Sequence, residues 1–90
     1  MKSRFNAEFS VLQITDEYIY IVDDCAKDSK SLTHDVENVL SYLTDMYKLG
    51  NKRLFYRDTD GQIDEIVHEN GKFIDFAPGF KGIADDLYNI

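Results

Sequence analysis

Residues 52–77, KRLFYRDTDGQIDEIVHENGKFIDFA, decide the fold of this chain. The stretch contains two turn dipeptides, Asp60-Gly61 and Asn70-Gly71, and each is flanked by residues typical of strands. Both dipeptides suit type I′ turns, because the two central residues of that turn need a positive φ and its twist matches that of paired strands. The stretch therefore predicts three consecutive antiparallel strands, a meander.

Two-residue loops at both dipeptides would fix the register of this meander. Counting outward from them places residues 57, 64 and 77 in one row across the strands, and residues 54, 67 and 74 in another. Side chains alternate between the two faces of a sheet. The core face is then expected to carry six apolar residues, interrupted only by Glu65: Leu54, Tyr56, Ile63, Val67, Ile74 and Phe76.

On the opposite face, which should be solvated, the same register brings three apolar side chains together: Phe55, Ile66 and Phe73. The charged residues around them include a cross-strand pair, Arg57 and Asp64, worth about 0.2–1 kcal/mol. An exposed apolar patch with a charged rim is typical of a partner-binding surface. These three residues are therefore candidate binding residues, although another segment or a second chain covering them fits the pattern equally well.

A strand hairpin is predicted upstream, because residues 4–14 and 18–22 are rich in alternating apolar, β-branched and aromatic side chains. A two-residue turn at residues 16 and 17 would place Ile14 opposite Ile19 and Leu12 opposite Ile21, with a bulge or change of face between residues 12 and 14. The other face of this hairpin would then carry four apolar residues: Phe9, Val11, Tyr20 and Val22.

One helix is predicted between the hairpin and the meander. Its apolar stripe has the spacing i, i+3, i+4, i+7 and consists of Val36, Val39, Leu40, Leu43, Met46 and Tyr47. Ser31 or Thr33 can cap its start, and Gly50 suits the position after its end. We expect a single α+β domain, residues 1–90, in which the helix packs on one face of an antiparallel sheet.

The chain is acidic, with a net charge of −7 over 90 residues. Proteins that bind nucleic acid draw most of the binding energy from Lys and Arg, so direct binding of DNA or RNA is not expected. A protein partner with a basic surface fits this charge, and a merely solubilising surface is the alternative. The candidate carboxylates for a basic partner are Asp23, Asp24, Asp35, Glu37 and Asp45.

The sequence predicts no catalytic residue, cofactor or metal site. Residues 56–67 resemble part of a calcium loop, but Tyr56 and Val67 stand at its first and twelfth positions, which need oxygen ligands. His34 and His68 are isolated, and the one cysteine, Cys25, follows two aspartates that disfavour a reactive thiolate. No nucleophile elbow or phosphate-binding glycine loop is evident, so we expect a protein that is not an enzyme.

The start of the chain, MKSRFN, does not resemble a signal peptide. No apolar run approaches the ~18 residues that a membrane-spanning helix needs. We therefore expect a cytoplasmic protein without membrane contact.

Several segments resemble small uncharacterised accessory proteins of tailed bacteriophages and prophages. They are FYRDTDG at 55–61, HENGKF at 68–73, FAPG at 76–79 and FSVLQ at 9–13. The resemblance covers most of the chain and implies a phage protein that acts in the cytoplasm of a bacterial host. It implies no catalytic or binding residue.

Two functions are compatible with these features. The first is an interaction protein that inhibits or modulates a host protein complex, for example a nucleic-acid-binding defence complex such as a CRISPR effector. Its carboxylates would then occupy the place of phosphates. The alternative is a small structural or self-assembling phage protein, such as a homodimer, that uses an apolar sheet face as its interface. Carboxylates gathered in one plane would favour the first function, and an apolar contact above roughly 1,000 Å² between copies would favour the second.

Overall fold

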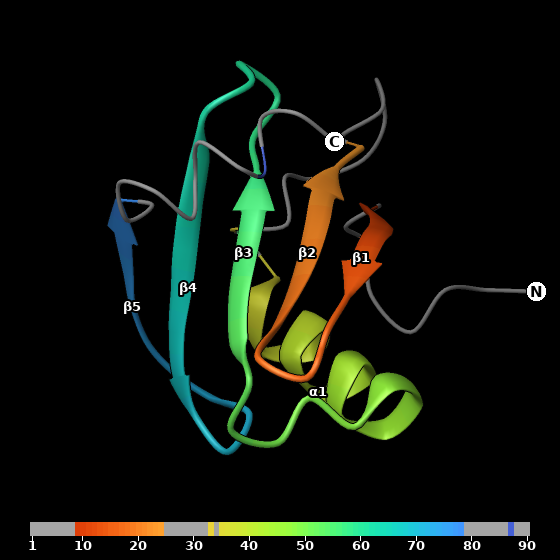
Figure 1. Cartoon of the computed structure of the whole chain (residues 1–90). Helices are drawn as coiled ribbons and strands as arrows, with labels where there is room; N and C mark the ends of the chain where they lie inside the picture. Colours follow the sequence, from red (N-terminus) through yellow and green to blue (C-terminus); the bar gives the residue numbers. More distant parts are fainter. Residues whose placement is uncertain (1–8, 25–32, 34, 79–86, 88–90) are drawn as a thin grey trace, which may run out of the picture.

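The computed structural model describes residues 9–24, 33, 35–78 and 87 (Figure 1). Within these residues, five strands form one sheet in the order β1-β2-β3-β4-β5, and the helix α1 packs on it. The elements are β1 (Phe9–Ile14), β2 (Tyr18–Asp23), α1 (Val36–Tyr47), β3 (Arg53–Arg57), β4 (Ile63–Glu69) and β5 (Lys72–Pro78). The predicted α+β class and the order of hairpin, helix and meander are confirmed.

The hairpin and the meander join into one sheet through a parallel pair, β2 and β3. Figure 1 shows these two strands side by side with their arrows pointing the same way. Parallel neighbours need a long crossover connection, and α1 lies within it. The amide of Arg53 donates to the carbonyl of Glu17 at 3.0 Å, which extends the junction to the turn before β2.

Helix α1 buries Val36, Val39, Leu40 and Leu43 against the sheet, as its apolar spacing predicts. Met46, which was expected in the same stripe, is instead 63% exposed. The helix begins after Asp35, so Thr33 is not its cap, and Ser31 lies outside the described residues. It ends at Tyr47, and the residue after it, Lys48, is left-handed (φ 55°). Gly50, which was expected in this role, is left-handed as well (φ 53°).

The main core fills the space between α1 and the sheet. Its buried side chains are Ile19, Ile21, Val36, Val39, Leu40, Leu43, Leu49, Leu54, Tyr56 and Ile66. A second, smaller cluster lies on the opposite face of the sheet and consists of Tyr20, Phe55, Ile63 and Leu87. The face that was expected to be solvated is therefore partly a second core.

The turn between β3 and β4 is longer than predicted. Besides glycines, only Lys48 and Asn70 among the described residues have a positive φ, so Asp60 does not form a type I′ turn. The Asp58 carboxylate accepts the amides of Asp60 and Gln62 at 2.9 Å each, and thereby holds a three-residue loop that closes with Gly61 at φ 88°.

This loop shifts the register of β4 by one residue relative to the prediction. Arg57 lies opposite Ile63, and Leu54 lies opposite Ile66. Because a one-residue shift moves every side chain to the other face, Ile66 joins the main core, while Ile63 and Glu65 join the opposite face. The predicted pair of Arg57 with Asp64 is therefore wrong.

The turn between β4 and β5 is the predicted two-residue loop, with Asn70 at φ 50° and Gly71 at φ 81°. A bulge interrupts the pairing beyond it, so that Val67 lies opposite Asp75 rather than Ile74.

Strand β1 contains a similar bulge. Ile14 does pair with Ile19, but Val11 replaces Leu12 opposite Ile21. As a result Phe9 and Val11 pack on the main core rather than beside Tyr20.

Candidate functional site

The predicted apolar binding patch does not form. Phe55 and Ile66 are both fully buried and belong to clusters on opposite faces of the sheet. Phe73 is half-buried against the main core. The shift of β4 described above is the reason, because the patch depended on Ile66 facing the same way as Phe55.

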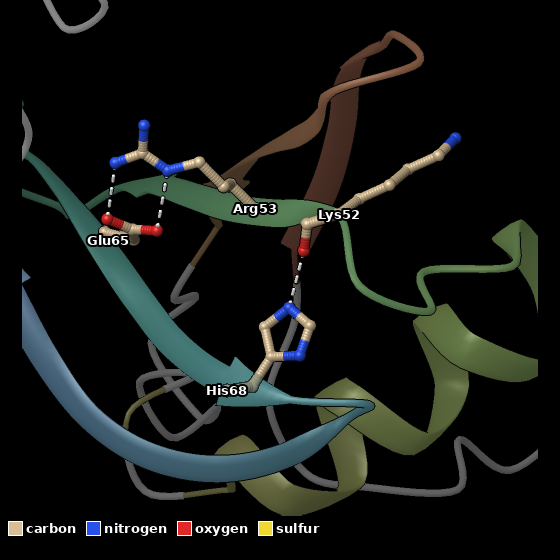
Figure 2. Close-up of polar contacts among 4 residues, drawn as sticks. All are labelled: Lys52, Arg53, Glu65 and His68. Atoms are coloured by element: carbon tan, nitrogen blue, oxygen red, sulfur yellow. Dashed lines mark hydrogen bonds and ion pairs between the residues drawn. The ribbon is translucent and has the colours of Figure 1, made fainter.

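An ion pair between β3 and β4 occupies part of that opposite face (Figure 2). The Arg53 guanidinium donates from Nε and Nη2 to the two carboxylate oxygens of Glu65, at 3.0 and 2.8 Å. It also lies over the Phe55 ring, 4.9 Å from the ring centre. The hydrogen bond with Glu65 raises the pKa of Arg53. The pair thus provides both oxygens of a nearly buried carboxylate with a hydrogen-bond donor.

His68 is bonded to the main chain through both ring nitrogens. Nδ1 accepts the amide of Gly71 at 3.0 Å, so Nε2 is the nitrogen that carries the proton and donates to the Lys52 carbonyl at 2.7 Å (Figure 2). This residue, isolated in sequence, therefore ties the turn after β4 to the start of β3. Both nitrogens are occupied, and neither is available to a metal ion.

Tyr56 stands at the end of the sheet where β3 finishes and β4 begins. Its burial, together with the charges of Asp64, Asp58 and Asp23, raises the pKa of the phenol to about 12. Within residues 9–24, 33, 35–78 and 87, no group of three or more His, Cys, Asp and Glu side chains could hold a metal ion. The loop that resembles a calcium site is the hairpin turn held by Asp58.

The five predicted partner-binding carboxylates lie at different depths. Asp23 is buried at the end of β2, so it cannot contact a partner directly. Asp24 is exposed and accepts a hydrogen bond from the Ser10 hydroxyl. Asp35 is half-buried before α1, whereas Glu37 and Asp45 are exposed in the first and last turns of that helix.

The acidic charge is concentrated in one half of the described fold. Residues 9–24 and 35–47, which form β1, β2 and α1, contain no Lys, Arg or His. Their seven acidic side chains are Asp16, Glu17, Asp23, Asp24, Asp35, Glu37 and Asp45. Residues 48–78, which form the meander, carry six acidic and five Lys or Arg side chains. We call the first group of elements the acidic half.

Exposed apolar side chains border both outer strands of the described sheet. On the β1 side they are Leu12 and Ile14, 42% and 46% exposed, and Met46 of α1. Met46 belongs to this side because Tyr42, one turn earlier on the helix, stacks edge-on against Phe9 of β1 at 5.8 Å. We call Leu12, Ile14 and Met46 the β1 edge surface. On the other side, the β5 edge surface consists of Ile74 and Phe76.

No family model, curated protein or solved structure matches this chain. The resemblance to phage accessory proteins therefore stays a prediction.

Two further observations concern a surface depression and the possibility of a membrane-spanning helix. An open depression of about 420 Å³ beside the turn after β4 is lined by Glu69, Asn70, Lys72, Phe73 and Ile74, with one charge of each sign. In the part of the chain that the structure describes, no helix is long and apolar enough to cross a bilayer.

The β1 edge surface is missed by the sequence analysis. Hydrophobic spacing places Met46 with the core. The break in alternation at Leu12 predicts a bulge or a change of face, but the sequence does not tell that Leu12 and Ile14 are exposed. The concentration of charge, in contrast, can be read directly from the sequence as the lack of Lys and Arg between Phe9 and Asp24.

Proposed function

We propose that this chain is a binding protein without catalytic activity, and that its acidic half binds a basic surface of a protein partner. The observation that carries this proposal is the separation of charge between the two halves of one sheet. Proteins that are merely kept soluble by charge usually intersperse both signs, whereas a field of one sign attracts and orients an oppositely charged partner.

The exposed side chains that would make this contact are Asp16 and Glu17 in the turn after β1, Asp24 after β2, and Glu37 on α1. Each exposed ion pair contributes little, about 0.2–1 kcal/mol. Several of them acting together speed association and make the affinity dependent on salt. The proposed contact is thus an extended electrostatic surface and contains no dominant residue.

A protein of this kind acts by occupying a basic groove that its partner uses for something else. For a phage protein in a bacterial cytoplasm, the groove could belong to a nucleic-acid-binding host complex, with carboxylates in the place of phosphates. This part of the proposal draws on the sequence resemblance and on the net charge of −7.

The test compares two triple variants that change the net charge equally. Asp16→Asn, Asp24→Asn and Glu37→Gln remove three exposed charges from the acidic half. Asp60→Asn, Glu69→Gln and Asp75→Asn remove three exposed charges from the meander. The probe is a fluorescent Lys- and Arg-rich peptide of about ten residues, and its Kd is measured by anisotropy at low and high NaCl.

We expect the first triple variant to weaken binding by about tenfold and the second by less than about twofold at low salt. In high salt both differences should shrink, because exposed charges are screened. Equal loss of affinity in the two variants would show that only the net charge acts, and that the acidic half is a solvated surface.

Self-assembly is the second candidate function, and it is favoured by the exposed Ile74 and Phe76 of the β5 edge surface. Strand edges with apolar side chains pair readily with other strands. Analytical ultracentrifugation of the wild type and of Ile74→Asp decides this point. A stable oligomer that Ile74→Asp dissociates would support self-assembly, and a wild-type monomer at high concentration would exclude it.

A further inference from the structure

We infer that the outer edge of β1 accepts an extended segment of the partner, with alternating apolar and basic residues, which pairs with β1 as an added strand. This inference rests on the proposed function, because it specifies how the partner of the acidic half is held. It concerns the same side of the molecule and adds a backbone contact to the electrostatic one.

The backbone of β1 provides the first reason. Among the described strands, β1 is the outermost on its side and pairs only with β2 (Figure 1). An outer strand presents unpaired amide and carbonyl groups, and addition of a peptide strand to such an edge is a common mode of recognition. The bulge at Leu12 restricts which registers fit, which selects against indiscriminate pairing.

The two faces of β1 differ, and this difference specifies the partner sequence. Toward α1, Ile14 lies in the row of the core residue Ile19. Met46 is exposed on α1, one turn after Tyr42, whose ring contacts that of Phe9 on β1. On the opposite face, Ser10 binds Asp24, and Gln13 accepts a hydrogen bond from the Tyr18 hydroxyl at 2.6 Å.

Because side chains alternate along a strand, one face of an added strand would meet the apolar side chains beside α1. Its other face would meet the polar side that ends in Asp24. The acidic turn at Asp16 and Glu17 lies at the far end of β1. Apolar residues toward α1 and basic residues toward the carboxylates therefore complement both faces.

The charges of the described residues disfavour a second copy of the chain as the occupant. Two β1 edges in contact would bring together two acidic halves that contain no Lys, Arg or His in their described residues. Pairing of β1 with β5 of another copy offers no net attraction, since β5 carries one Lys and one Asp. A segment of a different protein that carries both basic and apolar residues would make favourable apolar contacts and favourable charged contacts.

The experiment uses three labelled peptides of about ten residues. The first alternates valine and lysine, the second alternates serine and lysine, and the third is the first with every second amide N-methylated, which blocks its pairing edge. Anisotropy gives their Kd values for the wild type, for Ile14→Asp and for the matched control Ile74→Asp on the other edge, where the side chain is 57% exposed. Circular dichroism checks that both variants fold. If Ile14→Asp does not fold, it is replaced by Ile14→Thr, which keeps a β-branched side chain.

We expect the valine–lysine peptide to bind about tenfold more tightly than the other two. Ile14→Asp, or Ile14→Thr in its place, should remove this advantage, and Ile74→Asp should leave it within about twofold. Equal binding of the valine–lysine and serine–lysine peptides would overturn the added strand but leave the proposed electrostatic function standing. Binding of none of the peptides would overturn both proposals. A dimer of the wild type that Ile14→Asp dissociates would overturn the choice of a foreign partner.

Discussion

Substitution of Gly71 by alanine tests whether the turn after β4 packs against helix α1. Gly71 has φ 81°, and a Cβ atom at this position would lie 2.7 Å from Oγ1 of Thr44 on α1. Gly61 provides the matched control, because it has φ 88° but no atom within 4 Å of an added Cβ. The two positions share the conformational penalty and differ only in the contact with the helix.

The magnitude follows from two contributions. A left-handed backbone costs an alanine about 1–2 kcal/mol, and this applies to both glycines. At Gly71 the Thr44 side chain must also move, which disturbs its 2.8 Å hydrogen bond to the Leu40 carbonyl, and such a bond contributes about 0.5–1.5 kcal/mol. We therefore expect Gly71→Ala to lower the free energy of unfolding by about 1.5–3.5 kcal/mol and Gly61→Ala by about 1–2 kcal/mol.

Urea and thermal unfolding followed by circular dichroism measure both variants. A difference of 1 kcal/mol corresponds to about 4–8 °C in Tm for a domain of this size. Thr44→Ala removes the obstructing oxygen, so in that background Gly71→Ala should cost no more than Gly61→Ala. Equal destabilisation by the two single variants, or no relief from Thr44→Ala, would refute the packing of this turn against α1.

The remaining predictions concern three polar groups. Burial and nearby carboxylates raise the pKa of Tyr56 to about 12, so the folded state favours the neutral phenol. The stability that this residue contributes should be complete below pH ~10 and lost as the pH rises through about 12. Tyr56→Phe should flatten this part of the alkaline unfolding profile, and an unchanged profile would contradict the assignment. Glu65→Ala should cost about 1–3 kcal/mol in urea unfolding, because it leaves the Arg53 guanidinium without its carboxylate. The double variant with Arg53→Met should recover part of that loss, and additive losses would argue that the pair does not interact. His68→Ala should cost about 1–3 kcal/mol by unpairing a main-chain amide and the Lys52 carbonyl; a loss below about 0.5 kcal/mol would contradict both hydrogen bonds.

Element types and order follow from the sequence, because they depend on local signals. Asn70-Gly71 can form a two-residue turn with little strain, and the spacing of Val36, Val39, Leu40 and Leu43 suits only a helix. Both are confirmed. Such signals act within a few residues and need no knowledge of the tertiary structure.

The register of the sheet could not be obtained in the same way. Asp58 uses its own side chain to hold a longer loop than the Asp60-Gly61 dipeptide predicts. The bulge in β1 was one of two alternatives that the sequence left open, and the bulge in β5 has no clear sequence mark; each shifts the pairing by one residue. A shift by one residue exchanges the two faces of a strand. The wrong length of the β3–β4 loop therefore led to a wrong binding patch, in which Phe55 and Ile66 were assigned to one surface instead of to two cores.

Only the charge of the candidate site, and not its exposed apolar side chains, could be predicted from the sequence. The surplus of carboxylates among the residues before Lys48 is a property of the sequence, although its meaning depends on β1, β2 and α1 lying together in the fold. The exposure of Leu12, Ile14 and Met46 depends on which strand is outermost and on where the helix crosses the sheet. Neither can be derived from hydrophobic spacing alone.

The most direct test of the account is to map where a basic partner binds. The amide resonances of the ¹⁵N-labelled wild type are recorded by NMR during titration with the valine–lysine peptide. The account predicts that the largest chemical-shift changes fall within residues 9–24 and 35–47, with those of β1 foremost. Changes concentrated in residues 53–78 instead would contradict the assignment of the acidic half as the binding side.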